Sequence, residues 1–176
     1  MNNPKPITIN IEPEWLSPGY YVYVVEMKTK DKTYLYIGQT GDNNYTTARA
    51  PLYRLSGHFV KGQSTENQII KYLKATVAGE GELNNTQLDN LLTQTRFSYR
   101  FWKLDDFDGK DHEAKRMKAQ MVEHYLIYNL QRSKEFEVVN NPAKNEVTAK
   151  KLSFFSQDDI KNNSNLAIHI LKQLEK

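Results

Sequence analysis

The sequence contains no cysteine, so disulfide bridges, thiolate zinc sites and a cysteine nucleophile are excluded. It also lacks any run of about 18 apolar residues, the length that a membrane-spanning helix needs. The N-terminal residues have no apolar core of a signal peptide. These absences predict a cytoplasmic protein with no membrane partner. Repeats, low-complexity tracts and a recognisable DNA-reading module such as a zinc finger are absent too.

The size and composition of the chain indicate a globular protein of one domain, and they do not identify its function. A chain of 176 residues fits one domain with a modest core. Hydrophobic residues make up 39% and charged residues 26%, which is ordinary for a globular protein. The net charge of +3 favours an anionic partner only mildly. This balance permits nucleic acid as a partner without demanding it.

A β-hairpin is predicted near the start of the chain. Two aromatic and β-branched runs, Tyr20 to Met27 and Thr33 to Ile37, flank a charged connector at 28–32. Within these runs aliphatic residues alternate with tyrosines, so the aliphatic faces should line the core. The alternating residues are Val22, Val24, Leu35 and Ile37 against Tyr21, Tyr23, Tyr34 and Tyr36. Tyr21 and Tyr36 share a face only if cross-strand partner numbers sum to an odd value, which a connector of two or four residues gives.

A helix carrying an arginine and a histidine should follow a polar loop. Pro51 suits the first turn of this helix, and Gly62 is its expected end. Arg54 and His58 are four residues apart, so both side chains lie on one face of the helix. The sequence therefore predicts an arginine and a histidine side by side.

Apolar periodicity predicts the remaining elements. The expected helices lie near 65–77, 86–93, 112–130 and 160–174, and the expected strands near 97–104 and 136–139. Ser156 and Asp159 form a predicted capping pair for the last helix. Residues 1–18 read as an extended arm, in which alternating isoleucines at 7, 9 and 11 should pack as an edge strand. The fold class is α/β (α+β), a small central antiparallel or mixed sheet flanked by helices.

Three short motifs follow one another along the chain. They are Gly19, Tyr20 and Tyr21, then Tyr36, Ile37 and Gly38, and then Arg54 with His58. This order of motifs resembles the GIY-YIG nuclease family. Glu123 falls within a helix where the family carries its metal-binding glutamate, and Asn140 or Asn141 follows a short strand where it carries an asparagine. Asn140 is favoured because it directly follows Val138 and Val139.

The resemblance covers Gly19 to Asn141, with two departures from the family pattern. Tyr20 stands where the family has isoleucine. Sixteen positions separate Gly38 from Arg54, so GDNNYTTARAP must loop out. The implied organisation is an N-terminal arm at 1–18, a GIY-YIG-like nuclease domain at 19–145, and a helical extension at 146–176 packing on the same domain. Within the nuclease domain, 63–95 form a helical insertion.

The resemblance implies a metal-dependent DNA endonuclease. Glu123 would bind one Mg²⁺ or Mn²⁺, since magnesium keeps several waters and needs few protein ligands. Arg54 would stabilise the phosphate through its planar fork of donors. Tyr36, or alternatively Tyr21, would serve as general base. His58 would either relay the proton or bind phosphate.

Other interpretations remain open. The domain could be a catalytically inactive nucleic-acid-binding module on the same fold, or an unrelated α/β interaction protein in which both motifs are coincidental. Any one tyrosine could be an ordinary sheet aromatic. The acidic run at 105–108 and the histidines at 112, 124 and 169 are interpreted as solvated features. Restriction, repair, mobile-element and toxin roles are equally compatible with the sequence.

Overall fold

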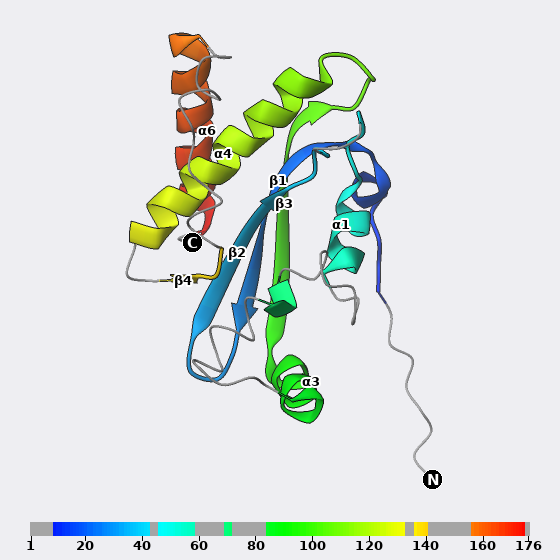
Figure 1. Cartoon of the computed structure of the whole chain (residues 1–176), viewed down its shortest axis with the longest axis vertical. Helices are drawn as coiled ribbons and strands as arrows, with labels where there is room; N and C mark the ends of the chain where they lie inside the picture. Colours follow the sequence, from blue (N-terminus) through cyan, green and yellow to red (C-terminus); the bar gives the residue numbers. More distant parts are fainter. Residues whose placement is uncertain are drawn as a thin grey trace.

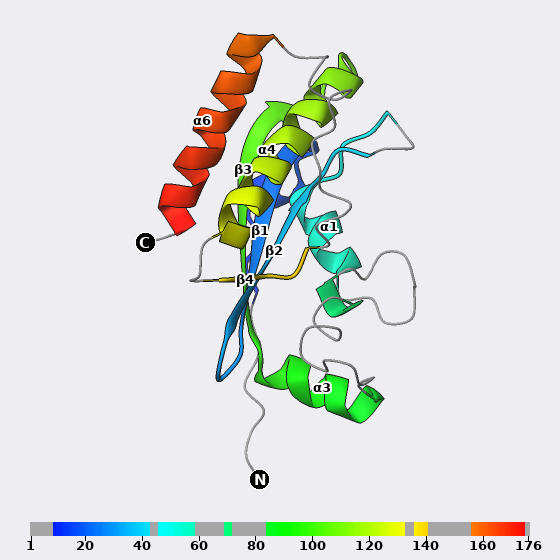
Figure 2. The ribbon, with the colours of Figure 1, turned by 60° about the vertical axis from the view of Figure 1, so that its left-hand side comes forward.

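The computed structural model describes residues 9–42, 46–58, 69–71, 84–132, 136–140 and 156–174. The fold is α+β, as predicted: a four-stranded mixed sheet in the order β3-β1-β2-β4 has helices on both faces (Figure 1). Helices α4 (His112–Arg132) and α6 (Gln157–Leu174) cover one face, and α1 (Pro51–Gly57) lies on the other (Figure 2). None of the helices in the described ranges combines the length and apolar character needed to cross a bilayer.

The predicted hairpin is confirmed. Strand β1 (Gly19–Lys28) pairs antiparallel with β2 (Thr33–Gln39), and Val25 lies opposite Tyr36. Partner numbers therefore sum to an odd value, and the connector has the four residues 29–32. Tyr36 consequently shares a face with the odd-numbered tyrosines of β1.

The two other strands join opposite edges of the hairpin. Strand β3 (Arg96–Asp106) pairs antiparallel with β1, with a bulge where the register shifts between Tyr20 and Tyr21. Strand β4 (Glu137–Val138) pairs parallel with β2. The sheet is therefore mixed, and the end of β2 that follows Leu35 extends beyond its pairing with β4.

The two faces of the sheet carry different cores. As predicted, the aliphatic face lines the core. It packs against α4 and α6, and the buried members of this cluster are Val22, Val24, Leu35, Ile37, Val122, Leu126, Ile127, Leu130, Ala167, Ile170 and Leu174. The opposite face is largely aromatic, and its buried members are Tyr23, Val25, Met27, Tyr34, Tyr36, Ile69 and Val139. The aromatic face is the one that faces α1.

Helix boundaries follow local capping chemistry. Pro51 occupies the first turn of α1 as predicted, but the helix ends at Gly57 with His58 as its C-cap, before the expected Gly62. Asn84 and Gln87 form a reciprocal capping box at the start of α3 (Asn85–Gln94). The predicted Ser156 and Asp159 pair caps α6. Of the helix expected near 65–77, only 69–71 lie among the described residues, and they are helical.

The predicted packing of the arm as an edge strand through its isoleucines is wrong at positions 9 and 11. Ile9 and Ile11 are 80% and 47% exposed, and the isoleucine at 7 lies outside the described residues. The arm instead makes a short 3₁₀ helix, η1 (Pro13–Leu16), because a proline removes a backbone donor and suits a helical first turn. Its anchor is Trp15, whose ring centroid lies 5.7 Å from that of Phe101.

Candidate active site

Tyr23 lies at the centre of a group of polar side chains on the aromatic face. Its ring crosses β2 over Gly38, its cross-strand partner. A Cβ added to Gly38 would lie 2.3 Å from the Tyr23 ring and hydroxyl, so only glycine leaves room for this crossing. The Tyr23 hydroxyl thereby reaches His58 Nε2 at 2.9 Å.

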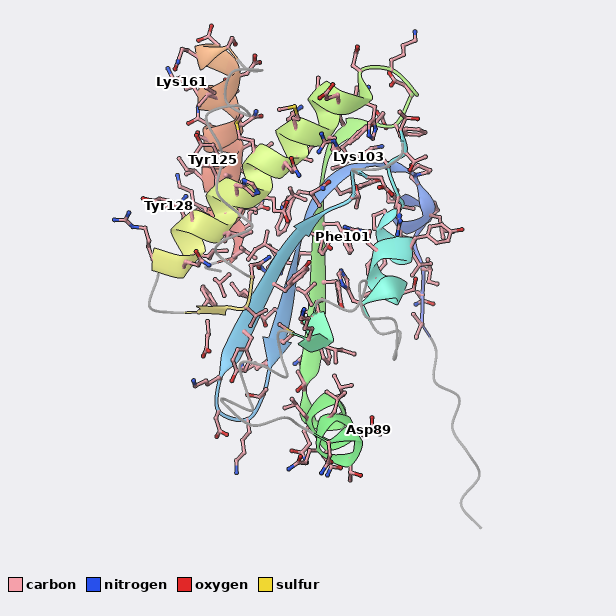
Figure 3. The ribbon with its side chains drawn as sticks, in the orientation of Figure 1. Asp89, Phe101, Lys103, Tyr125, Tyr128 and Lys161 are labelled. Carbon is pink, nitrogen blue, oxygen red and sulfur yellow. The ribbon has the colours of Figure 1, made fainter. Side chains whose placement is uncertain are left out.

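Aromatic neighbours fix the orientation of the Tyr23 ring. The Phe101 centroid lies 5.3 Å away, and Figure 3 shows Phe101 between β3 and α1 in this view. The Tyr36 ring lies 6.3 Å from Tyr23 and meets the His58 ring edge-on at 5.4 Å. Tyr23, Tyr36 and His58 are all at most 5% exposed. The predicted residues Tyr36 and His58 are therefore in contact, and Tyr23 joins them.

His58 is a neutral imidazole at physiological pH. Burial, followed by the positive charge of Arg54, lowers the pKa of His58 to about 4. Its Nδ1 is buried and has no hydrogen-bond partner among the described residues. A neutral imidazole keeps one nitrogen lone pair, so His58 can accept a proton at pH 7.

This buried histidine should make the protein less stable in acid. In the unfolded chain His58 takes up a proton below its ordinary pKa of 6.5, whereas in the folded protein it does so only near 4. The contribution of His58 to the free energy of unfolding is therefore complete above pH 6.5. It falls as the pH drops towards 4, by on the order of 3 kcal/mol in total. We expect urea titrations of His58→Gln to show a smaller loss between pH 7 and pH 4 than the wild type. His169→Gln, at an exposed histidine, is the control, and it should follow the wild-type profile; equal losses in all three proteins would contradict the prediction.

Arg54 places its guanidinium at the end of β2. Its Nη2 donates to the Gln39 carbonyl at 3.0 Å, while its buried Nε has no hydrogen-bond partner among the described residues. Burial by itself lowers the pKa of Arg54, but Tyr23, Tyr36 and the two carboxylates of Glu123 and Asp42 outweigh it, so the net shift is upward. The guanidinium therefore stays charged and keeps an unused donor for an anion.

The pKa of Tyr23 is raised, chiefly by burial. The charge of Arg54 and hydrogen bonds with Tyr36 and Arg54 work against this rise, and the charge of Glu123 adds to it. Tyr23 is therefore a protonated phenol at neutral pH. Tyr23 can take part in proton transfer only if it releases its hydroxyl proton while it accepts a second proton from another group. His58 Nε2 lies within hydrogen-bond distance to receive the released proton.

Glu123 approaches the same group from α4. Its side chain is half-buried, and its charge acts on both Arg54 and Tyr23. Among the described residues no three or more histidine, aspartate or glutamate side chains gather into a metal-binding group. A single carboxylate near an arginine fits a hard cation that keeps several of its waters and takes other oxygens from a substrate.

Tyr21 was predicted for the site, but its hydroxyl points elsewhere. It donates to the Ser17 carbonyl at 3.2 Å, next to η1, and the Tyr21 backbone N–H is held by Thr40 Oγ1 at 2.9 Å. Tyr21 and Tyr23 lie on the same face of β1, so alternation alone does not separate them. The distinguishing signal is Gly38, since the hairpin register places it opposite Tyr23.

Asn140, the other predicted site residue, holds the edge of β2. Its Oδ1 accepts from the Ile37 N–H and its Nδ2 donates to the Ile37 carbonyl, both at 2.8 Å. The side chain thus extends the ladder of β4 along the strand that carries Tyr36 and Gly38. These contacts make Asn140 a positioning residue; Asn141 lies outside the described residues.

Two histidines interpreted as solvated are not. His124 is only 5% exposed. His112 lies 2.8 Å from the Tyr20 hydroxyl through Nδ1 and 3.1 Å from the Asp42 carbonyl through Nε2. Because a carbonyl only accepts, Nε2 of His112 carries a proton. His112 therefore ties the segment after β2 to the first turn of α4. His169 is exposed, as predicted.

Comparisons with known proteins do not assign the chain to a family, since no family model matches it and neither the curated proteins nor the solved structures yield a match. The resemblance therefore rests on the motif residues of the sequence.

Proposed function

We propose that this protein is a metal-dependent endonuclease of the GIY-YIG type that hydrolyses DNA phosphodiester bonds. The observation that carries the proposal is the group formed by Tyr23, Tyr36, Arg54, His58 and Glu123. These residues come from β1, β2, α1 and α4 and lie together at one end of β2. The group combines a fixed cation, a carboxylate, two phenols and a neutral imidazole, the functional groups needed for hydrolysis of a phosphodiester.

Arg54 and Glu123 have the role of neutralising negative charge on the phosphate. The buried Nε of Arg54 and its remaining guanidinium donors bind the phosphoryl oxygens, where negative charge develops during in-line attack. Glu123 is the protein ligand for Mg²⁺ or Mn²⁺. Such an ion, when bound, lowers the pKa of a coordinated water and neutralises charge on phosphate.

The tyrosines and His58 handle the proton. Tyr36 hydrogen-bonds Tyr23, and Tyr23 lies against His58 Nε2. A proton taken from the attacking water by Tyr36 passes to Tyr23 as Tyr23 releases its own proton to His58. The neutral state of His58 at pH 7 is what allows it to be the acceptor.

Two tyrosines on one strand provide a matched test of the assignment. Tyr23→Phe keeps the ring over Gly38 but removes the hydroxyl that meets His58, so plasmid cleavage in magnesium or manganese should fall by about 10²- to 10³-fold. Tyr21→Phe removes a hydroxyl that bonds Ser17, and it should cut at nearly the wild-type rate.

The same assay separates the alternatives. If the wild type binds DNA without cutting it under either metal, the inactive-module interpretation replaces the endonuclease. If Tyr23→Phe cuts as fast as Tyr21→Phe, the proton path through Tyr23 is wrong. If the wild type neither binds nor cuts DNA, the interaction-protein interpretation gains support.

A further inference from the structure

We propose that Gln39 is a positioning residue for the cleavage reaction, because its side chain fixes the backbone carbonyl that orients the Arg54 guanidinium. The chemical role of Arg54 rests on the proposed function, whereas the contacts that orient Arg54 do not. The evidence is the position of Gln39 at the end of β2 and the two hydrogen bonds that its amide group makes with the backbone of Gly41.

The outer edge of β2, which is turned away from β1, is covered by three different groups in succession. The Leu35 carbonyl accepts from the backbone N–H that follows β4, at 2.9 Å. The Asn140 amide then bonds both backbone groups of Ile37. At the next residue on this edge, the Gln39 carbonyl accepts from Arg54 Nη2 at 3.0 Å. The guanidinium thus continues the ladder of hydrogen bonds along the strand, and its orientation depends on where the Gln39 carbonyl points.

The Gln39 side chain holds the backbone that immediately follows this carbonyl. Its Nε2 donates to the Gly41 carbonyl at 2.9 Å, and its Oε1 accepts from the Gly41 N–H. Both bonds are buried, and Gln39 is only 7% exposed. A side chain that bonds both backbone groups two residues further on closes a ring around the peptides between them and restricts their rotation. The direction of the Gln39 carbonyl is therefore set by the amide group of the same residue.

Thr40 anchors the other edge of the same segment to β1. Its hydroxyl donates to the Gly19 carbonyl at 2.6 Å and accepts from the Tyr21 N–H at 2.9 Å. Its backbone N–H donates to the Tyr21 carbonyl at 3.1 Å. These bonds fix the segment on the side of β1, so Gln39 has the separate role of fixing its outer side.

The orientation matters because Arg54 has to present one particular donor. A guanidinium is planar, so the bond from Nη2 to the Gln39 carbonyl and the bond with Tyr23 together set the plane of the whole group. Its Nε is buried and has no hydrogen-bond partner among the described residues. In the proposed reaction this donor meets a phosphoryl oxygen, and a misplacement of about 1 Å can cost roughly 10²-fold in rate.

A double-mutant cycle on plasmid cleavage tests whether Gln39 acts through Arg54. Gln39→Met keeps the length of the side chain but removes both hydrogen bonds to Gly41, so kcat should fall by about 10- to 100-fold. The charge of Arg54 remains, so KM should stay within about twofold of the wild-type value. In the Arg54→Ala background, Gln39→Met should change the single-turnover rate by less than about twofold, because no guanidinium is left to orient.

Gln87→Met is the matched control for Gln39→Met. Gln87 also accepts a backbone hydrogen bond through its amide, from Asn84 in the capping box of α3. Helix α3 adjoins the end of the sheet where β2 begins, far from Gln39 (Figure 1). Gln87→Met should therefore cut like the wild type. Urea denaturation of both variants checks that each is folded at the assay temperature.

Arginine side-chain NMR gives a readout that does not need cleavage. In the isotope-labelled wild type, the Nη signals of Arg54 are identified by their loss in Arg54→Ala. They should be resolved from one another, because the bonds with Gln39 and Tyr23 slow the rotation of the guanidinium. In Gln39→Met these signals should merge, and in Gln87→Met they should stay resolved.

The outcomes separate this inference from the proposed function. Resolved Nη signals in Gln39→Met, or an equal loss of rate with and without the Arg54 guanidinium, would overturn the positioning role and leave the endonuclease intact. Merged signals in Gln39→Met, together with a wild type that does not cut DNA, would support the orientation of Arg54 by Gln39 and refute the endonuclease. If Arg54→Ala cuts too slowly for a rate to be measured, the NMR comparison alone decides the positioning role.

Discussion

Glu123→Gln should cut no plasmid in magnesium or manganese while binding DNA at least as tightly as the wild type. The substitution keeps the size of the side chain and removes the charge that we propose binds the metal. Loss of the metal removes several kcal/mol of transition-state stabilisation, so the rate should fall by roughly 10³-fold or more. Binding should persist because one fewer carboxylate repels the phosphates.

Two measurements are needed for Glu123→Gln, the rate of plasmid nicking and the affinity for a labelled duplex in EDTA. Glu113→Gln is the matched control, since Glu113 lies exposed in the first turn of the same helix. It should cut like the wild type. Nicking by Glu123→Gln at the Glu113→Gln rate would remove Glu123 from the chemistry.

Much of the fold was predictable because its signals are local. The period-two alternation of Val22 and Val24 with tyrosines predicted which face of β1 carries the aliphatic core. The register depended on the length of the connector, which the sequence left open and the structure shows to be four residues. The long helix around Glu123 and the Ser156 cap also rest on residues close in sequence. These features depend on propensity and periodicity, which a single sequence carries.

The position of the arm depends on contacts between distant residues and was not predictable. The isoleucines at 9 and 11 alternate as in a strand, yet they are exposed, because Pro13 diverts the chain into η1 and Trp15 finds a partner in Phe101. Alternation predicts a strand only if a sheet edge is there to receive it. A tertiary contact decided the outcome here.

The order of motifs assigned four residues to the candidate site, and the structure brings them together. They are Arg54, His58, Tyr36 and Glu123. Tyr23 was missed, although it lies at the centre of the group. Two tyrosines that are two residues apart cannot be distinguished by the alternation pattern of a strand. They differ in the residue that lies opposite each of them on the neighbouring strand. Tyr23 faces a glycine, so its ring can cross β2, whereas Tyr21 bonds Ser17 instead.

Gly38 should therefore be the position where a single methyl group does the most damage. In Gly38→Ala the new Cβ would lie 2.3 Å from the Tyr23 ring and hydroxyl, and the ring cannot stay in place. Overpacking of this kind lowers the free energy of unfolding by about 1 to 3 kcal/mol. The displaced hydroxyl also loses His58, so cleavage should fall by at least the roughly 10²- to 10³-fold expected for Tyr23→Phe.

Gly57→Ala is the control for Gly38→Ala, because its Cβ meets no atom within 4 Å and alanine favours a helix more than glycine does. It should be neutral or slightly stabilising, with full cleavage. A double-mutant cycle with Tyr23→Ala then locates the clash. Removing the ring should cancel most of the stability cost of Gly38→Ala in urea denaturation, since the two residues interact directly. If Gly38→Ala costs the same free energy of unfolding with and without the Tyr23 ring, the ring does not lie over Gly38, and the path from Tyr23 to His58 loses its structural basis.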